Sequence, residues 1–389
     1  MKILHAIISM DPAGGGPPIM AARLAAAQAS LGCQTRIVSY RFPETQSRIA
    51  TALQGIPGIA GVRLDELPPP GPLERFFASG VKPFVQPMLA DVDLVHLHGV
   101  WDPLIYAVSR LAAKAGKPYV VTPHGMLDPW SLSQKRMKKQ IALQLGYRRM
   151  LNGAAFLHFL NSDERDLTRD LQLTARSLII PNGIFLEELD PLPARGKFRD
   201  AHRELAGAKI VLFLSRLHYK KGLDYLADAF AVVVKDFPDA RLVVAGPDDG
   251  AKAAFEQQTA RLGIADRVHL VGPLYGAEKI AALRDCDCFC LPSRQEGFSL
   301  AVTEAMACES PVVISAECHF PEVAQAGAGI IAKLNASDIA AGIKTVLQDA
   351  DSAKRMGLAG RELVVSRFTW PKVAEQMIEG YQQAIQVRK

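Results

Sequence analysis

Two carboxylates bracket the start of one predicted helix in the second half of the chain. Glu296 lies in the loop before that helix, and Glu304 lies about one turn inside it. The apolar runs at 286–291 and 311–314 on either side do not alternate with polar residues, which is typical of buried parallel strands. In a strand, loop, helix, strand unit, a ligand lies beyond the carboxyl end of the first strand, where the helix points its free N–H groups. We therefore expect an anion to bind at the loop 292–299.

A phosphate group alone does not explain two acids beside an anion-binding helix. Carboxylates accept paired hydrogen bonds from vicinal hydroxyls, whereas helix N–H groups and basic side chains bind a diphosphate. Glu296 and Glu304 therefore indicate a ligand with phosphates flanked by hydroxyl-rich rings. The alternative is that both acids only complement the dipole of the helix, which we expect from Leu300 to about Cys308.

A basic loop lies near the start of the same half of the chain. Arg216 and Lys221 belong to the loop 215–222, which follows a predicted strand at 210–214 and precedes a predicted helix. An arginine fork and a lysine point charge in a strand-to-helix loop are suited to a diphosphate. A solvated loop is the alternative. Because the Glu296 loop belongs to the same predicted sheet, we favour a shared binding site.

A glycine-rich loop at 14–16 follows the first predicted strand, at 2–9, and precedes a predicted helix at 19–31 and a strand at 36–40. This order opens a doubly wound α/β domain. The loop is not a dinucleotide fingerprint, because Ile19 stands where the third glycine is required, and no P-loop lysine follows. The glycines permit a ligand to approach the backbone closely, and a plain tight turn is the alternative.

Two histidines follow further predicted buried strands of the first half. His98 comes after the strand at 94–97, and His124 comes after the strand at 118–122. The carboxyl ends of such strands are where ligands gather, so we expect a functional role, more for His124 than for His98. Ordinary polar loop residues are the alternative.

The chain of 389 residues is longer than one ordinary core and fits two domains of about 150 to 200 residues each. The charged, turn-rich stretch 190–209 predicts a linker, so we expect domains at 1–192 and 193–371 and a terminal helix at 372–389. The sequence has no run of about 18 apolar residues and no secretory cleavage site near its N-terminus. We expect a cytoplasmic protein.

Cysteines and aspartates do not indicate a metal site. Cys286, Cys288 and Cys290 alternate within a predicted buried strand, which favours reduced packing residues over disulfides or zinc ligands. The strings at 91–93 and 285–287 match a metal-binding Asp-x-Asp pattern. Each precedes a buried strand, so we interpret them as solvated strand-start residues and expect no metal.

Basic residues are concentrated in one segment without an acid, 131–152, whose apolar residues have helical spacing. The six bases are Lys135, Arg136, Lys138, Lys139, Arg148 and Arg149. A basic amphipathic helix at 134–151 can lie on an anionic membrane surface or hold an acidic ligand, and an ordinary solvated helix face is the alternative. A Pro- and Gly-rich stretch at 55–80 predicts a loop that carries Phe76 and Phe77 near the open face of the first domain.

Taken together, these motifs resemble family 4 of the retaining glycosyltransferases, which have the GT-B fold. The resemblance covers nearly the whole chain and rests on SRLHYKKG at 215–222, EGFSLAVTE at 296–304, HGM at 124–126, PNG at 181–183 and the glycines at 14–16. It implies two facing Rossmann-like domains with an interdomain cleft, an N-terminal acceptor domain and a C-terminal donor domain, and a last helix that crosses back to the first domain.

The resemblance also implies roles for single residues. Arg216 and Lys221 would hold a diphosphate and act in catalysis with His124, which contacts the transferred sugar, and Glu296, which binds the donor sugar. The full set expected to bind the donor is Gly15, Gly16, Arg216, Lys221, Glu296, Gly297, Phe298, Ser299, Leu300 and Glu304, with the ribose at Glu304 and the distal phosphate at the two glycines. Family members commonly have glycine where this chain has Glu309, so we expect the helix before it to lose its left-handed C-terminal cap.

The function implied is metal-independent, retaining transfer of a hexosyl group from a nucleoside-diphosphate sugar to a glycan hydroxyl. GDP-mannose is the first guess for the donor, and a polyprenyl-diphosphate-linked glycan of exopolysaccharide or O-antigen assembly is the expected acceptor. The protein would then be cytoplasmic or peripheral on the inner face of the plasma membrane, with no cofactor and no nucleic acid partner. A GT-B nucleotide-sugar epimerase is the alternative. A nicotinamide-dependent dehydrogenase is disfavoured by the missing third glycine, and a sugar-binding transport protein by the missing export signal.

Overall fold

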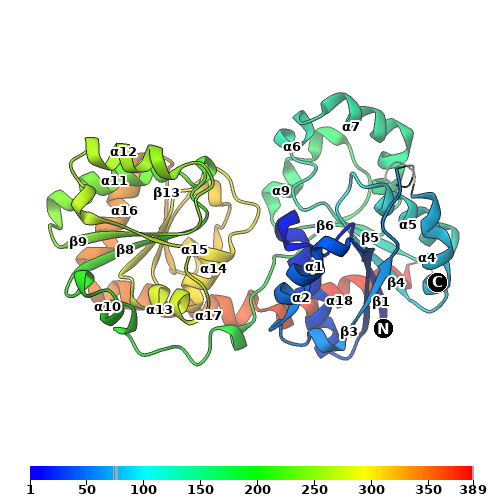
Figure 1. Cartoon of the computed structure of the whole chain (residues 1–389), viewed down its shortest axis with the longest axis horizontal. Helices are drawn as coiled ribbons and strands as arrows, with labels where there is room; N and C mark the ends of the chain where they lie inside the picture. The colour runs from blue at the N-terminus through cyan, green and yellow to red at the C-terminus, as the bar shows by residue number, and fades with distance from the viewer. Residues whose placement is uncertain (73, 75–77, 388–389) are drawn as a thin grey trace. The chain divides into compact units, whose positions relative to one another are not determined.

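The computed structural model describes residues 1–72, 74 and 78–387, and the chain folds into two compact units. The first unit comprises Met1–Gly183 and the chain from Trp370 onward, and the second comprises Ile184–Thr369. Each unit is built on one parallel sheet with helices on both faces (Figure 1). Phe76 and Phe77 lie outside the described residues.

The first unit has a seven-stranded parallel sheet in the order β3-β2-β1-β4-β5-β6-β7. Its central strands are buried on both faces, which explains why their sequences are nearly continuous apolar runs. The strands are β1 Lys2–Ala6, β2 Gln34–Tyr40, β3 Val62–Leu67, β4 Leu94–His98, β5 Tyr119–Thr122, β6 Phe156–Phe159 and β7 Ser177–Ile179.

Helices cover both faces of this sheet. On one face α1 (Gly16–Ser30) packs against α18 (Trp370–Gln386), so the end of the chain belongs to the first unit. On the other face α5 (Pro103–Lys114) packs against α4 (Lys82–Ala90) and α8 (Arg148–Asn152). Among the described residues of this unit, the other α-helices are α2 Gln46–Leu53, α6 Pro129–Ser133, α7 Arg136–Ala142 and α9 Ser162–Asp166.

The second unit has a six-stranded parallel sheet in the order β10-β9-β8-β11-β12-β13. Its strands are β8 Lys209–Leu214, β9 Ala240–Ala245, β10 Val268–Gly272, β11 Cys288–Leu291, β12 Val312–Ser315 and β13 Gly329–Ala332. Helices α11 and α16 pack together on one face, and α13, α14 and α17 lie on the other (Figure 1). The helix bounds are α10 Lys197–Ala201, α11 Leu223–Asp236, α12 Lys252–Arg261, α13 Gly276–Asp285, α14 Leu300–Ala307, α15 Glu322–Gln325, α16 Ala336–Gln348 and α17 Ala350–Arg367.

Both sheets reverse their strand order once, and the reversal defines where a ligand can bind. In the first unit the order reverses between β1 and β4, and in the second unit it reverses between β8 and β11. In doubly wound sheets the loops after the two strands at this switch point diverge and leave a crevice at their carboxyl ends. The loops 215–222 and 292–299 both follow strands of the switch point in the second unit.

Two edge strands were not predicted. Strand β3 lies within the stretch 55–80, which the sequence analysis assigned to a loop, and it pairs with β2 in parallel. Strand β13 pairs with β12 at the other unit's edge. An edge strand pairs with one neighbour only and is less completely buried than a central strand, so its local sequence carries a weaker signal.

The stretch 190–209 is part of the second unit rather than a linker. Asp285, which is 3% exposed, accepts hydrogen bonds from the backbone N–H groups of Gly196 (2.6 Å) and Phe198 (2.7 Å). Phe198 is itself buried in the core of this unit. The division between the units therefore falls at Gly183, before the expected 192. Asp285 is buried and not solvated as the sequence analysis expected.

Glu309 keeps the left-handed C-terminal conformation that the sequence analysis expected to be lost. Its φ is +59°, although left-handed backbone costs a residue with a side chain about 1 kcal/mol or more. Its carboxylate lies 2.5 Å from the Arg284 guanidinium, and its carbonyl accepts from Arg195. These interactions offset the backbone strain, which the sequence alone does not reveal.

The cysteines of the second unit pack in its core. Cys286, Cys288 and Cys290 are at most 1% exposed and are free thiols. Burial raises the pKa of the Cys286 thiol to about 12, so it remains protonated and unreactive at neutral pH. Their role as packing residues agrees with the interpretation from the sequence.

Candidate functional site

The two loops at the switch point of the second unit touch each other. Gly222 ends the loop after β8 with a φ of +70°, and a Cβ on it would lie 1.9 Å from the carbonyl oxygen of Pro292. Only glycine fits this approach, for both its conformation and its lack of a side chain. Arg294 N–H, in the loop after β11, also donates to the carbonyl of Lys220 at 2.7 Å. The loop with the residues predicted to bind the diphosphate and the loop with the residue predicted to bind the sugar are therefore adjacent.

Lys221 and Glu296 are brought together by this contact. Lys221 Nζ lies 2.6 Å from Glu296 Oε1, and Ser293 Oγ donates to the same oxygen at 2.6 Å. The two charged side chains are 16% and 9% exposed, so each is largely removed from water and depends on the other. This pair places an ammonium group directly beside a carboxylate at the switch point of the sheet.

Arg216 and Glu304 lie in the same region of the unit but have different partners. Arg216 Nη1 lies 2.6 Å from Asp249 Oδ2, and its side chain is 66% exposed, so it is accessible to a ligand. Glu304, in α14, lies 2.8 Å from Lys279 Nζ of α13. The structure does not show Arg216 in contact with Lys221, so their joint binding of one diphosphate stays a prediction.

The residues between the two acids have structural roles that fix the start of α14. The Ser299 hydroxyl caps the helix by accepting a hydrogen bond from the N–H of Val302, and the helix begins at Leu300 as predicted. Phe298 packs against Phe320, with ring centroids 5.3 Å apart. Gly297 has open space where a side chain would be, so its backbone can be approached from that side.

Arg294 is a residue that the sequence analysis missed. Its guanidinium pairs with both carboxylate oxygens of Asp224 (2.8 and 2.6 Å) and lies over the rings of Tyr219 and Tyr225. It thereby ties the loop after β11 to the loop after β8 and to the start of α11. Nothing in the local sequence distinguishes Arg294 from a solvated loop arginine, because its partners are about 70 residues away.

In the first unit, the glycine loop precedes α1 at the switch point. Gly15 adopts φ 97° and ψ −153°, which is a conformation almost restricted to glycine. Helix α1 begins at Gly16, before the predicted start at residue 19, because Pro17 and Pro18 are tolerated in a first helical turn. A Cβ on Gly16 would meet open space, so a ligand could approach here.

His124 lies in a tight turn after β5 with a φ of +52°. Its Nε2 is 3.2 Å from Nδ1 of His98, which ends β4 and is 4% exposed. His98 therefore lies deeper in the protein than His124 and does not face a ligand. Burial lowers the pKa of His124 to about 3, so the ring is neutral at pH 7.

Glu164 fixes this turn and was not found from the sequence. Its two carboxylate oxygens accept hydrogen bonds from the N–H groups of Gly125 (2.6 Å) and Leu160 (2.7 Å). Glu164 is 7% exposed, and burial raises the pKa of its carboxyl. It links the turn after β5 to the end of β6, whereas in the sequence it is one of several acids in a short polar helix.

The basic segment is not one helix as predicted. It is divided into α6, α7, a π-helical turn and α8, with Gly146 at φ +138°. Met137, Ile141 and Leu145 are 76%, 52% and 75% exposed, so the apolar stripe predicted from the helical spacing faces solvent. Lys139 is bound to the carbonyl of Ser131 at 2.6 Å and is less available than the exposed bases beside it.

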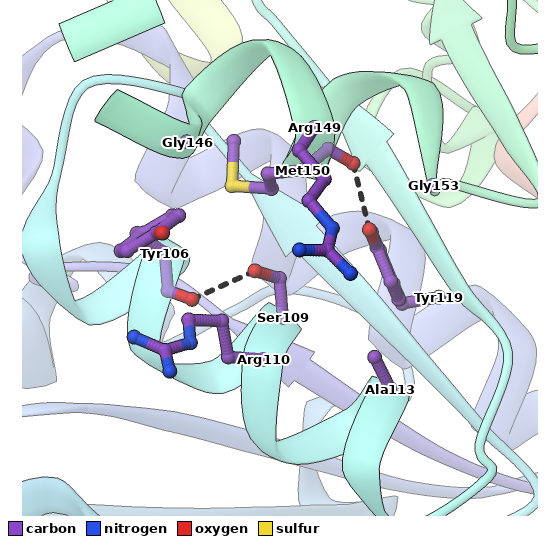
Figure 2. A pocket seen from close by; sticks show the side chains of 9 residues that line it. All are labelled: Tyr106, Ser109, Arg110, Ala113, Tyr119, Gly146, Arg149, Met150 and Gly153. Carbon is purple, nitrogen blue, oxygen red and sulfur yellow. Dashed lines mark hydrogen bonds between the residues drawn. The ribbon is translucent and has the colours of Figure 1, made fainter. Parts of the chain in front are cut away.

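A cavity of about 490 Å³ lies between this segment and α5 (Figure 2). Arg110 and Arg149 extend along it from α5 and α8, and Gly146 lies at its edge. A Cβ on Gly146 would lie 2.2 Å from the Tyr106 hydroxyl, so the kink at Gly146 requires glycine. Among the described residues, no helix is both long and apolar enough to cross a membrane.

Comparisons with known proteins identify the class. In structure, the chain is similar to Anabaena Alr3699/HepE in complex with UDP and glucose, with a TM-score of 0.74, 20% identity and coverage of 98% of this chain and 100% of that one. The chain thus has the GT-B fold, with two Rossmann-like domains, which confirms the predicted fold class.

Sequence comparison gives the family. Residues 15–183 match the model of the glycosyl transferase 4-like domain, and residues 194–363 match that of glycosyl transferases group 1. The chain belongs to family 4 of the glycosyltransferases. It is 26% identical to a D-inositol 3-phosphate glycosyltransferase of Kineococcus radiotolerans (96% of this chain, 92% of the relative) and 26% identical to a phosphatidyl-myo-inositol mannosyltransferase of Mycobacterium leprae (95% and 93%).

The contact at Gly222 can be tested by substitution. Gly222→Ala should lower the free energy of unfolding by about 3 kcal/mol or more, because the new methyl group collides with the Pro292 carbonyl. Gly263→Ala is the matched control, since Gly263 has the same φ of +70° but open space around it, and should cost only about 1 kcal/mol. Urea denaturation of both variants measures the difference. Equal losses would contradict the close packing of the two loops.

Proposed function

We propose that this glycosyltransferase transfers a hexosyl group from a nucleoside-diphosphate sugar, with retention, to a hydroxyl of a lipid-linked glycan acceptor. The observation that carries the proposal is the Lys221–Glu296 pair, 2.6 Å apart at the switch point of the second unit. A diphosphate requires a positive charge, and a sugar ring requires a group that accepts hydrogen bonds from its hydroxyls. This pair supplies both within one crevice.

Donor binding would exchange the partners of this ion pair. The diphosphate takes the place of Glu296 at the Lys221 ammonium, and the freed carboxylate accepts hydrogen bonds from the sugar hydroxyls. No charge is left buried without a partner at either stage, which avoids a cost of several kcal/mol. Arg216 is exposed and can turn from Asp249 toward the second phosphate.

Chemistry then depends on stabilising the leaving group. Negative charge develops on the diphosphate as the bond to the sugar breaks, and Lys221, Arg216 and the first N–H groups of α14 neutralise it. The departing phosphate oxygen takes the proton of the acceptor hydroxyl on the same face, so the new bond keeps the configuration. His124 contacts the transferred sugar. GDP-mannose is our first choice of donor, supported by the mannosyltransferase among the relatives.

Replacing either of the two basic side chains, Lys221 or Arg216, should weaken donor binding. Lys221→Ala and Arg216→Ala should each reduce turnover by about 100-fold or more, equal to roughly 3 kcal/mol of lost charge stabilisation. Lys235→Ala, an exposed lysine at the far end of α11, is the control and should bind normally. Calorimetry with UDP and GDP measures affinity, and release of free nucleoside diphosphate with and without acceptor measures transfer.

Unchanged affinity and rate in both variants would remove the assignment of the diphosphate site. Conversion of one nucleotide sugar into its epimer, without release of the nucleotide, would instead identify an epimerase.

Activity should not require a metal ion. Both Asp-x-Asp strings are engaged by the protein itself: Asp91 and Asp93 bind Lys2, and Asp285 and Asp287 bind backbone N–H groups. We expect the full transfer rate in excess EDTA, because Lys221 and Arg216 supply the positive charge. If activity were lost in EDTA and restored only by Mg²⁺ or Mn²⁺, the role proposed for Lys221 and Arg216 would be wrong.

The basic segment supports peripheral binding to an anionic membrane, where a lipid-linked acceptor would be found. Lys135, Arg136 and Lys138 are exposed next to the exposed apolar side chains of Met137 and Ile141. Bases attract the anionic surface and apolar side chains enter the interface. The name of the mycobacterial relative includes a phosphatidyl lipid. A water-soluble acceptor is the alternative, and the inositol phosphate in the name of the other relative favours it.

Vesicle co-sedimentation tests the membrane proposal. Binding should need anionic lipid and should decrease with salt, because exposed charges are screened within about 10 Å at 0.1 M ionic strength. Changing Lys135, Arg136 and Lys138 to Glu should weaken it by about 100-fold or more, at about 1 kcal/mol per base. The same change at the exposed Lys235, Lys252 and Lys354 should have little effect. Equal pelleting with neutral and anionic vesicles, or none at low salt, would exclude membrane docking and leave the transferase proposal intact.

A further inference from the structure

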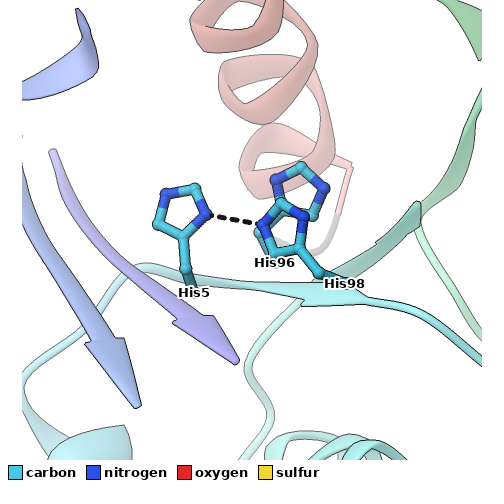
Figure 3. A group of neighbouring side chains, drawn as sticks. All are labelled: His5, His96 and His98. Carbon is cyan, nitrogen blue, oxygen red and sulfur yellow. Dashed lines mark hydrogen bonds between the residues drawn. The ribbon is translucent and has the colours of Figure 1, made fainter. Parts of the chain in front are cut away.

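A continuous chain of buried polar side chains crosses the sheet of the first unit and ends at His124. It contains five of the nine histidines of the protein. Figure 3 shows three of the rings, His5, His96 and His98, close together. We call this set the histidine chain; its members in order are the Ile180 carbonyl, His158, Thr122, His96, Tyr381, Gln28, His5, His98 and His124.

The direction of the chain is fixed at the Ile180 end. A backbone carbonyl can only accept, so His158 Nε2, 2.7 Å away, must carry a proton. Burial lowers the pKa of His158 to about 4, so the ring is neutral and its Nδ1 is an acceptor. The Thr122 hydroxyl, 2.8 Å from this Nδ1, therefore donates to it. Thr122 Oγ1 then accepts from His96 Nε2 at 2.6 Å.

The histidine chain continues through α18 and α1, two helices that cover the sheet. Because His96 is neutral with its proton on Nε2, its Nδ1 accepts from the Tyr381 hydroxyl of α18 at 2.5 Å. The Tyr381 oxygen is then free to accept from the amide N–H of Gln28 in α1, 3.2 Å away. This orients the Gln28 amide, whose oxygen accepts from His5 Nε2 at 2.8 Å.

Beyond Gln28, the position of the proton on each imidazole ring determines the position of the proton on the next ring. His5 carries its proton on Nε2, so its Nδ1 accepts from His98 Nε2 at 3.0 Å. His98 Nδ1 in turn accepts from His124 Nε2 at 3.2 Å. His124 is left with its proton on Nε2 and with an unprotonated Nδ1.

The opposite direction does not satisfy the chain. If the Gln28 amide were reversed, Tyr381 would donate to it and His96 would donate to Tyr381. His158 would then have an unprotonated Nε2 against the Ile180 carbonyl, which places two acceptors 2.7 Å apart in a buried site. Such an unsatisfied pair costs about 1 to 3 kcal/mol. One tautomer of each ring is therefore favoured.

A buried metal ion is the competing explanation. His5, His96 and His98 each offer a ring nitrogen within 4.8 Å of the others, which would suit a three-histidine site. However, both nitrogens of all three rings already have hydrogen-bond partners within the histidine chain. A metal would have to break at least two of these hydrogen bonds, including the one between His5 and His98.

We propose that the histidine chain locks His124 as its Nε2–H tautomer, so that Nδ1 accepts a hydrogen bond from a hydroxyl of the transferred sugar. Tyr381 and Gln28 are then positioning residues for His124, although neither touches it. This inference rests on the proposed sugar-binding role of His124. It also gives the C-terminal helix a part in the site, because Tyr381 supplies the link that orients Gln28.

The tautomers can be measured without any substrate. In the ¹⁵N spectrum of the histidine rings of the full-length protein, His124 should show a protonated Nε2 and an unprotonated Nδ1; its signals are identified by their loss in His124→Asn. Tyr381→Phe removes one hydroxyl and leaves the Gln28 amide free to turn, so His124 should become a mixture of both tautomers. Tyr119→Phe is the matched control. It removes another buried hydroxyl of the unit, which donates to the Met150 carbonyl, and should leave His124 unchanged.

Activity separates this inference from the proposed function. With the donor saturating, Tyr381→Phe should lower kcat by about twofold, as expected when the two tautomers are about equally populated and only one is active, and Tyr119→Phe should not. A mixed or Nδ1–H tautomer of His124 in the parent protein would overturn the inference, and so would about one equivalent of zinc retained per chain by the purified protein. A changed tautomer in Tyr381→Phe with unchanged kcat would overturn the positioning role. A protein that shows the predicted tautomers but transfers no sugar would contradict the proposed function and not the chain.

Discussion

The contact between Gly222 and the Pro292 carbonyl is the constraint on which the site of the second unit depends. Parallel strands β8 and β11 are neighbours, so the loops that follow them emerge at the same edge of the sheet. The missing side chain at Gly222 lets the two loops touch, and this brings Lys221 within 2.6 Å of Glu296. A cation and a carboxylate that are 75 residues apart thus share one crevice.

The core of the first unit contains a network of hydrogen-bonded polar side chains. Buried polar groups destabilise a protein unless they are hydrogen-bonded, yet four histidines and a threonine of this network are buried around one sheet. Each has a partner, and together they form a polarised network that ends at the turn of His124. Glu164 holds the backbone of the same turn through Gly125. The position of His124 and the state of its ring are therefore set by residues from both ends of the chain.

Several predictions from the sequence were wrong where distant residues decide the local structure. The segment 190–209 looks like a linker, but Asp285 binds its backbone and Phe198 enters the core. Glu309 was expected to lose the left-handed cap, but its pairing with Arg284 allows the strained backbone. The basic helix is broken at Gly146, beside the hydroxyl of Tyr106. In each case the partner is at least 25 residues away.

The sequence by itself determined the class of fold and the family, because buried parallel strands leave continuous apolar runs and the loops after them keep a recognisable pattern of glycines, bases and acids. It also placed Arg216, Lys221, Glu296 and His124 in loops at the carboxyl ends of strands. Only the tertiary structure decided which of these residues meet. It paired Lys221 with Glu296, placed His98 behind His124, and revealed Arg294, Glu164 and the link from Tyr381 to Gln28. The reason is physical: local sequence specifies burial and turns, whereas a hydrogen bond between side chains requires that separate elements be packed at a fixed distance.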